Sequence, residues 1–342
     1  MQKTKNILLT LVLLFLMLFS VIYSDSLKYA VSCGVKVCLE TIVPSLYFFM
    51  VISSMLVDSP FIDIFSKISN KFAKAIFGFD GKIFSIFLLS QFGGYPIGIK
   101  LLSLLYEKGE ITRRRAMRYA CFCFSSGPAF ILGVVSHKSQ LSAILISCTL
   151  SNLIAAILLC RFSTDSQPVC IARKPIGISL VKSAKSAADA LLNICIMILF
   201  MRAALSIVQN LGIITLISRL AHIPASIVAS VFEVTYVLTV ISVPACAALL
   251  SFGGICVALQ LRSIASFRFD MAKFVAARAV CAVISAVICN AIYEPPAKQY
   301  ISVIAPVQSA GTDSDILQSS ALILMCCILL AKNSRQMKNN ML

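Results

Sequence analysis

The sequence predicts an all-α polytopic membrane protein of about eight transmembrane helices, plus two broken or re-entrant helices. Three observations lead to this fold class. Hydrophobic residues make up 59% of the 342 residues and charged residues 13%, which leaves too little polar surface for a soluble domain of this size. The basic residues lie between long apolar runs. Two of those runs are interrupted by a Gly-Gly pair.

The first interruption lies at residues 88–100, which read Leu-Leu-Ser-Gln-Phe-Gly-Gly-Tyr-Pro-Ile-Gly-Ile-Lys. In hydrocarbon every backbone N–H and C=O needs an internal partner, so a broken helix survives only beside protein or a water-filled cavity. Glycine permits unusual backbone angles and proline removes a donor. We therefore expect a discontinuous or re-entrant helix over 83–106. The alternative is a spanning helix that uses its glycines to pack tightly on a neighbour.

The second interruption, Leu-Leu-Ser-Phe-Gly-Gly at 249–254, repeats residues 88–94 with one residue deleted. Gly-interrupted apolar segments in corresponding halves of a chain are a sequence sign of a transporter-like binding site. The pairing suggests such a site where the two breaks meet.

Eight further apolar runs account for the predicted spans. They cover residues 7–23, 31–57, 119–135, 141–159, 188–208, 223–243, 275–292 and 316–331. The run at 7–23 is longer than a signal peptide requires, so we expect an uncleaved first span.

The charge distribution predicts the topology. The net charge is +16, and five cations, Lys108, Arg113, Arg114, Arg115 and Arg118, lie in one short loop. Basic loops stay in the cytoplasm. We therefore expect a multi-pass protein of the cell membrane with both termini inside and the acidic loop 294–315 outside. A nucleic-acid or phosphate site is a more specific explanation of the cations in this loop. Topology explains them better, and we expect no nucleic-acid partner.

A basic amphipathic helix is predicted after Asp58-Ser59-Pro60. Apolar residues recur at helical spacing (Phe61, Phe65, Ile68, Phe72 and Ile76), opposite Lys67, Lys71 and Lys74. Such a helix lies on the membrane surface and is attracted to the anionic inner leaflet.

Two carboxylates within apolar runs, Glu40 and Glu233, are candidates for a coupling-ion site, because a charge at that depth normally faces a cavity or a partner. Glu40 could instead lie near the interface, with Pro44 simply kinking the helix. Another break is expected at Ser125-Ser126-Gly127-Pro128, since the residue before a proline avoids the helical region.

The chain offers little for catalysis or metal binding. Most of the 14 cysteines lie in apolar runs, no CxxC pair occurs, and the two histidines, His137 and His222, are isolated. No phosphate-binding loop is present. We expect no enzymatic activity, metal or cofactor.

Two motifs carry a resemblance. Gln-Phe-Gly-Gly-Tyr-Pro-Ile-Gly at 91–98, followed by Cys-Phe-Ser-Ser-Gly-Pro-Ala-Phe-Ile at 123–131, resembles the YlbJ-like sporulation integral membrane proteins, which are grouped with nucleoside-recognition or gate domain proteins. Glu-Val-Thr at 233–235 and Gln260 fit the same pattern. The chain departs from it at Phe124-Ser125, where paired asparagines are expected, and at Val237, where a glycine is expected. Both departures remove polar or backbone ligands.

The resemblance implies two gate-like repeats and a role in building the spore envelope. The implied organisation is an anchor (1–28), a first repeat (29–160), a cytoplasmic connector (161–185), a second repeat (186–332) and a cytoplasmic tail (333–342).

Two functions follow as hypotheses. The first is movement of a small polar solute, nucleoside-like or another metabolite, across the membrane. The second is a scaffold that recruits spore-envelope partners or forms a homo-oligomer. For the first, the expected substrate-binding residues are Gln91, Gly93, Gly94, Tyr95, Pro96, Ser125, Ser126, Gly127, Pro128, Glu233, Thr235, Gly253, Gly254 and Gln260.

Overall fold

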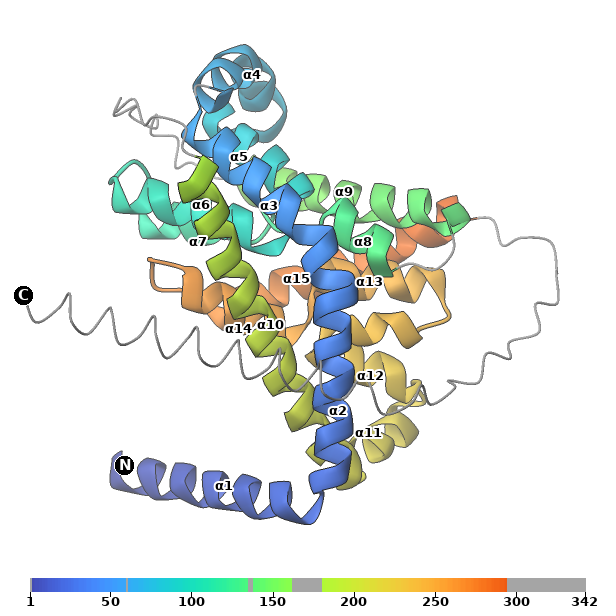
Figure 1. Ribbon diagram of the computed structural model, residues 1–342. Helices are drawn as coiled ribbons and strands as arrows, with labels where there is room; N and C mark the ends of the chain where they lie inside the picture. Colours follow the sequence, from blue (N-terminus) through green and yellow to red (C-terminus); the bar gives the residue numbers. More distant parts are fainter. Residues whose placement is uncertain (1, 60, 135–137, 162–179, 294–342) are drawn as a thin grey trace, which may run out of the picture.

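A computed structural model describes residues 2–59, 61–134, 138–161 and 180–293, and in this part of the chain every regular element is a helix (Figure 1). The first half contains α1 (Gln2–Ile22), α2 (Ser24–Val37), η1 (Cys38–Ile42), α3 (Val43–Asp58), α4 (Phe61–Phe77), α5 (Gly81–Gly93), α6 (Tyr95–Glu107), α7 (Arg113–Ala120), α8 (Pro128–Val134) and α9 (Lys138–Cys160). The second half contains α10 (Leu180–Asn210), α11 (Ile213–Ala221), α12 (Ala225–Phe232), η2 (Val234–Thr239), α13 (Val243–Phe252), α14 (Gly254–Ile264) and α15 (Met271–Ile292).

Five helical segments of the described chain are long and apolar enough to cross a membrane: Ser24–Leu56, Leu141–Cys160, Leu180–Asn210, Val243–Ile264 and Met271–Ile292. A sixth arises if α11 and α12, which meet at 116°, form one broken span. The prediction of an all-helical, multi-pass architecture is confirmed. The count of eight spans is not established, and the expected span 316–331 and loop 294–315 lie outside the described residues.

At Pro44, where a kink was one of two possibilities, a single π-helical turn, η1, joins α2 to α3. Proline has no N–H, and its ring collides with the carbonyl four residues earlier. A wider turn, in which the Val43 N–H bonds to the Cys38 carbonyl, absorbs that collision and lets the helix continue. Glu40 lies within this turn and is exposed on the outside of the bundle.

The first Gly-Gly segment is a helical hairpin. Lys82, at the start of α5, and Glu110, just beyond the end of α6, form an ion pair with Nζ and Oε2 2.5 Å apart. Because the two ends of the α5–α6 unit meet, both lie at the same face of the protein. The turn is made at Gly94, whose φ of +81° is a conformation that other residues rarely adopt.

The second Gly-Gly segment is broken but does not turn back. Helices α13 and α14 follow one another through Gly253 and are together long and apolar enough to form one candidate span of 22 residues. The hairpin has the form that re-entry predicts for the first segment, and α13–α14 has the length that crossing predicts for the second.

Two expected spans are not continuous helices. In 119–135, α7 ends at Ala120 and α8 begins at Pro128, with non-helical chain between them. In 223–243, α12 ends at Phe232, Glu233 is extended, and a short 3-10 helix follows. Apolar composition identified both segments, but it gives no information about backbone conformation where protein surrounds the chain.

Two basic loops from different halves lie on one face, at the left of Figure 1. Arg113, at the start of α7, donates from Nε to the backbone carbonyl of Arg268 in the α14–α15 connection, at 3.3 Å. Together with Arg262 these residues line a shallow polar hollow. Asp270, in the same connection, caps α15. Its carboxylate accepts a hydrogen bond from the Lys273 backbone N–H, and this bond lowers the pKa of the carboxyl group.

The predicted amphipathic helix is α4, and it uses two of its faces. Ile62, Ala73 and Phe77 are buried against the core. Beside them runs an exposed apolar stripe (Ile64, Ile68, Phe72 and Ile76), next to the exposed Lys67, Lys71 and Lys74. The helix therefore packs on protein and still offers an apolar and basic surface to lipid.

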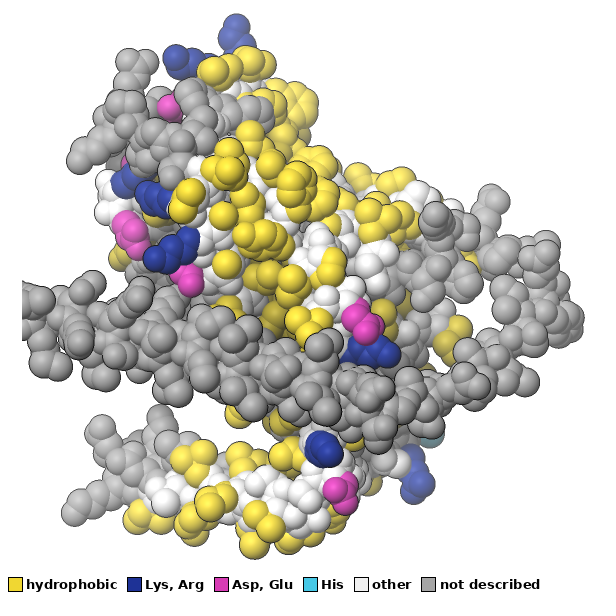
Figure 2. Space-filling view, in the orientation of Figure 1, with side chains coloured by type: hydrophobic (Ala, Val, Ile, Leu, Met, Phe, Trp, Pro, Cys, Tyr) yellow, Lys and Arg dark blue, Asp and Glu magenta, His cyan; other side chains and the backbone are white. Residues whose placement is uncertain are grey.

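Hydrophobic side chains also cover the face of the protein over α3, as Figure 2 shows.

Candidate functional site

A small cavity lies between the two halves, where their helix breaks come together. It is lined by residues of both halves: Ile42, Leu46, Tyr95, Pro96, Ser126 and Phe130 from the first, and Ile194, Ile198, Glu233, Val234, Thr235, Cys256, Val257 and Gln260 from the second. Its volume open to a water-sized sphere is about 20 Å³, which is room for about one water molecule.

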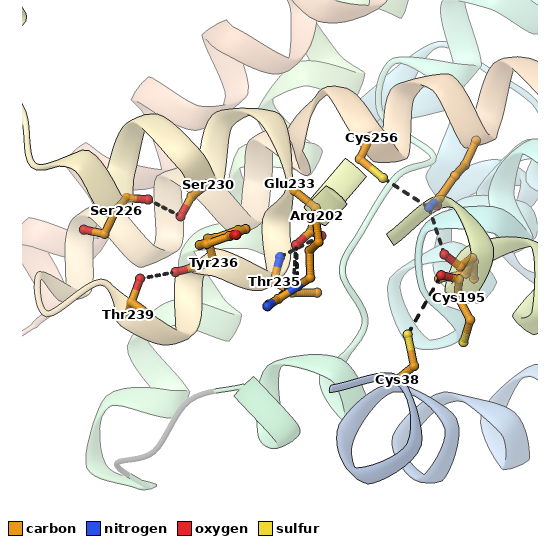
Figure 3. A network of polar contacts seen from close by, with 12 residues as sticks. Cys38, Cys195, Arg202, Ser226, Ser230, Glu233, Thr235, Tyr236, Thr239 and Cys256 are labelled. Atoms are coloured by element: carbon orange, nitrogen blue, oxygen red, sulfur yellow. Dashed lines mark hydrogen bonds and ion pairs between the residues drawn. The ribbon is translucent and has the colours of Figure 1, made fainter. Parts of the chain in front are cut away.

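One end of the cavity is polar and is formed by Glu233 and Thr235, which are in turn bound by Arg202 (Figure 3). The Glu233 carboxylate is fully buried and accepts hydrogen bonds from the Thr235 backbone N–H, at 3.0 Å, and from the Thr235 hydroxyl. Arg202 on α10 lies with Nε 3.6 Å from Glu233 Oε2 and donates to Thr235 Oγ1 from Nε and Nη2, at 3.2 and 2.8 Å. A buried carboxylate needs this kind of pairing, because an isolated charge would be too costly.

Local sequence explains why a carboxylate occupies this position. Glu233 follows α12 with extended angles (φ −137°, ψ 113°), so its side chain caps the next helix, η2. Gly254 allows the close approach of the second Gly-Gly break, since a Cβ there would lie 3.2 Å from the Val234 nitrogen. In the first half, a Cβ at Gly127 would lie 3.1 Å from the Gly94 Cα. In each half, the Gly-Gly break thus packs against that half's other break.

Arg278 on α15 joins the two halves behind the cavity. It is fully buried, and all five of its N–H donors are used. The acceptors are the Ser251 carbonyl and hydroxyl at the end of α13, the Cys121 carbonyl after α7, and Asn152 Oδ1 on α9. Because the ends of α7 and α13 carry partial negative charge, they compensate the guanidinium without a carboxylate among these partners.

The Arg278 network also holds the first Gly-Gly helix. Asn152 donates from Nδ2 to Gln91 Oε1, at 3.1 Å, and to the Phe124 carbonyl, at 2.7 Å. The guanidinium carbon of Arg278 lies 4.4 Å from the Phe124 ring centroid. One cation therefore fixes α5, the non-helical segment after α7, and α13 against one another.

The structure divides the expected site residues into two groups. Those that line the cavity are Tyr95, Pro96, Ser126, Glu233, Thr235 and Gln260. The others do not line it: Gln91 binds Asn152, Ser125 accepts from the Gly127 N–H, and Gly93, Gly94, Gly127, Pro128, Gly253 and Gly254 belong to the packed breaks. Gly93 and Gly253 do not line the cavity, and the side chains of Ile97 and Phe124 lie where their Cβ atoms would be.

Of the two coupling-ion candidates, only Glu233 faces the cavity. Glu40 does not line it and is exposed on the opposite surface of the η1 turn. Sequence reasoning did not assign Arg202, Asn152 or Arg278 to the site. Their position within apolar runs indicated that they have polar partners, since cations and amides inside a membrane need them. The spacing along the chain did not identify those partners.

The cavity offers few free polar groups. Ser126 Oγ is buried and has no hydrogen-bond partner in the described part of the chain. Gln260 donates from Nε2 to the Ile194 carbonyl, at 3.4 Å. Most of the remaining wall is aliphatic or aromatic. In this conformation the cavity could hold a water or a small ion, whereas a nucleoside-sized molecule would need the halves to separate.

The fold and this cavity define a multi-pass helical membrane protein built around broken helices. The chain is similar to the sporulation integral membrane protein YlbJ of Bacillus subtilis (strain 168), with 25% identity over 189 residues. The match covers 54% of this chain and 46% of that protein, so less than half of the relative's length is represented. No family model and no solved structure matches the chain. That relative is described as an integral membrane protein of sporulation, and the expected nucleoside-recognition grouping of this chain is not confirmed.

Proposed function

We propose that this protein moves a small polar solute across the membrane of a sporulating cell, through a site centred on Glu233. The observation that carries this proposal is the meeting of broken helices from both halves at one cavity with a buried carboxylate. Transporters bind substrates and coupling ions at such breaks, because the freed backbone and side-chain groups are available there.

The arrangement of Glu233 supports a coupling role. Its carboxylate bonds to Thr235 and Arg202, so gain or loss of a proton or ion at Glu233 would change how η2 and α10 are held together. Since η2 and α10 both line the cavity, a local charge change can be transmitted to the opening of the site.

The experiment is flux into liposomes containing the purified protein, with labelled uridine, alanine, glycerol and citrate, under an imposed proton or sodium gradient. Glu233→Gln should reduce gradient-driven flux of the accepted solute at least tenfold. Glu40→Gln is the matched control, because Glu40 is an exposed carboxylate in an apolar run, and it should leave flux within twofold of wild type. An equal loss of flux in both variants would contradict a coupling role for Glu233.

A second candidate function is a membrane scaffold without transport. The observation that favours it is the closed state of the centre: the cavity holds about one water molecule, and every N–H of Arg278 is occupied. If correctly folded protein gives no flux for the whole panel under either gradient, while Glu233→Gln still lowers thermal stability, the scaffold proposal is favoured.

A further inference from the structure

A second, more polar hollow lies between α6 and α10, and we infer that it is the entrance to the central cavity and binds a small zwitterionic solute there. This inference rests on the proposed transport function and extends it to the access route and substrate class. The polar residues that line the hollow are Ser54, Lys100, Ser103, Glu107, Ser186, Asp189, Asn193 and Ser266.

The polar side chains form one stripe on each of two facing helices. On α6, Lys100, Ser103 and Glu107 recur at three- and four-residue spacing, and on α10 Ser186, Asp189 and Asn193 do the same. This spacing places each set on one face of its helix. Both helices are otherwise largely apolar, and ionisable groups on such helices normally face a partner or water.

The two stripes do not close against each other. Lys100 Nζ donates to the Ser186 hydroxyl across the helices, and Glu107 accepts from Ser266. A volume of about 300 Å³ nevertheless remains between the stripes, at the lower end of the range for small-molecule sites. A polar seam that only held helices together would be filled by its own side chains.

The hollow is separated from the central cavity by a single layer of side chains. Pro96 lines both spaces. On α3, Leu46 lines the cavity and Met50, one turn further, lines the hollow. On α10, Ile194 lines the cavity and its neighbour Asn193 lines the hollow. A shift of this layer would join the two spaces into one path.

The hollow lies beside the basic face of the protein. Glu107 ends α6 and Ser266 lies in the α14–α15 connection, and Arg113, Arg262 and Arg268 lie in or next to the same two connections. Lys/Arg-rich connections stay on the cytoplasmic side. The hollow is therefore the cytoplasmic entrance, and the single layer beneath it is the inner gate.

Charge selects the solute class. The hollow presents one ammonium, on Lys100, and two carboxylates, on Glu107 and Asp189, on helices that face each other. A zwitterion can place its carboxylate toward Lys100 and its ammonium toward Asp189 or Glu107, so that each of its charges meets a group of opposite sign. An anion would meet two carboxylates, and a neutral solute would gain no charge–charge contact in the hollow.

The first test is accessibility. Asn193→Cys should react with a charged, membrane-impermeant thiol reagent applied from the cytoplasmic side, well above the labelling of wild type. Phe200→Cys on the same helix is the control, because Phe200 is exposed on an apolar surface that the reagent should not reach. Reaction of Phe200→Cys but not Asn193→Cys, or reaction of Asn193→Cys only from outside, would overturn the entrance.

The second test is binding without transport, measured as thermal stabilisation of the detergent-purified full chain. The zwitterions alanine, glutamine and glycine betaine are compared with lactate and isopropylamine. At least one zwitterion should stabilise wild type, whereas lactate and isopropylamine should not. Asp189→Asn and Lys100→Gln should each weaken the apparent affinity at least tenfold.

The outcomes separate this inference from the transport proposal. Zwitterion binding that depends on Asp189 and Lys100, without flux in liposomes, supports the site and argues against transport. Flux with no response to any zwitterion, or an equal response to lactate, overturns the site while transport stands. If a variant unfolds, the site is tested instead by labelling Asn193→Cys from the cytoplasmic side with and without the stabilising zwitterion. A zwitterion bound in the hollow should slow that labelling.

Discussion

The Tyr95 hydroxyl donates a hydrogen bond of 3.0 Å to the backbone carbonyl of Leu250, 155 residues further along the chain. Tyr95 directly follows the first Gly-Gly pair, and Leu250 lies in the helix that ends at the second. The Tyr95 ring also approaches Gly253, where its Cε1 would lie 3.3 Å from a Cβ atom. The two Gly-Gly breaks therefore touch through Tyr95, and a change at one should be felt at the other.

Gly253→Ala should test this packing. Gly253 has φ of +84°, which costs an alanine about 1–2 kcal/mol, and the new methyl would overlap the buried Phe124 ring, adding roughly 1–3 kcal/mol of overpacking. The measurement is the free energy of unfolding in detergent.

Gly109→Ala is the matched control, because Gly109 has φ of +70° and nothing within 4 Å of the added methyl. It should lose only the backbone contribution. The packing account fails if both variants are destabilised equally, or if Phe124→Leu does not partly rescue Gly253→Ala.

Arg278→Lys should destabilise the protein by about 3 kcal/mol or more. An ammonium cannot reach the ends of α7 and α13 and the Asn152 amide together, and each hydrogen bond to a charged group is worth about 1.5–3 kcal/mol. Arg262→Lys is the control, since Arg262 is exposed, and it should change the melting temperature little. Equal tolerance of both changes would mean that the network holds no part of the fold.

Both ends of the α5–α6 hairpin should face the cytoplasm. Cysteines introduced at the exposed positions Lys71 and Lys108 should be labelled by an impermeant reagent from the same, inner side. Reporter proteins fused at points along the chain should also place residues 113–118, 173–185 and the C-terminus in the cytoplasm, and residues 294–315 outside. Labelling of Lys71→Cys and Lys108→Cys from opposite sides would contradict re-entry.

The lysines of α4 should attract anionic lipid. Replacing Lys67, Lys71 and Lys74 by Glu should weaken the association by roughly 1 kcal/mol per removed cation, and the loss should shrink as salt rises. The measurement is thermal stability in nanodiscs with and without phosphatidylglycerol. An identical difference in both lipids would show that α4 depends on its packing against α5 alone.

The amino-acid sequence was enough to predict the helical membrane class and the places where helices break. Hydrocarbon forces apolar runs to satisfy their backbone internally, so composition alone predicts helices such as α9 and α15. Gly94, Gly253 and Pro128 mark real interruptions, because their backbone preferences are local properties of the chain.

Which of the breaks meet, and what lies between them, followed from the packing of the helices and not from the sequence pattern. The same Gly-Gly pattern turns back at Gly94, where Lys82 and Glu110 join the ends of α5 and α6, and continues at Gly253, where α13 packs along α15. The partners of Glu233 and Arg278 come from segments 27 to 157 residues away as well as from adjacent positions. Sequence spacing holds no record of such distant contacts, since the burial that selects them exists only once the helices have packed.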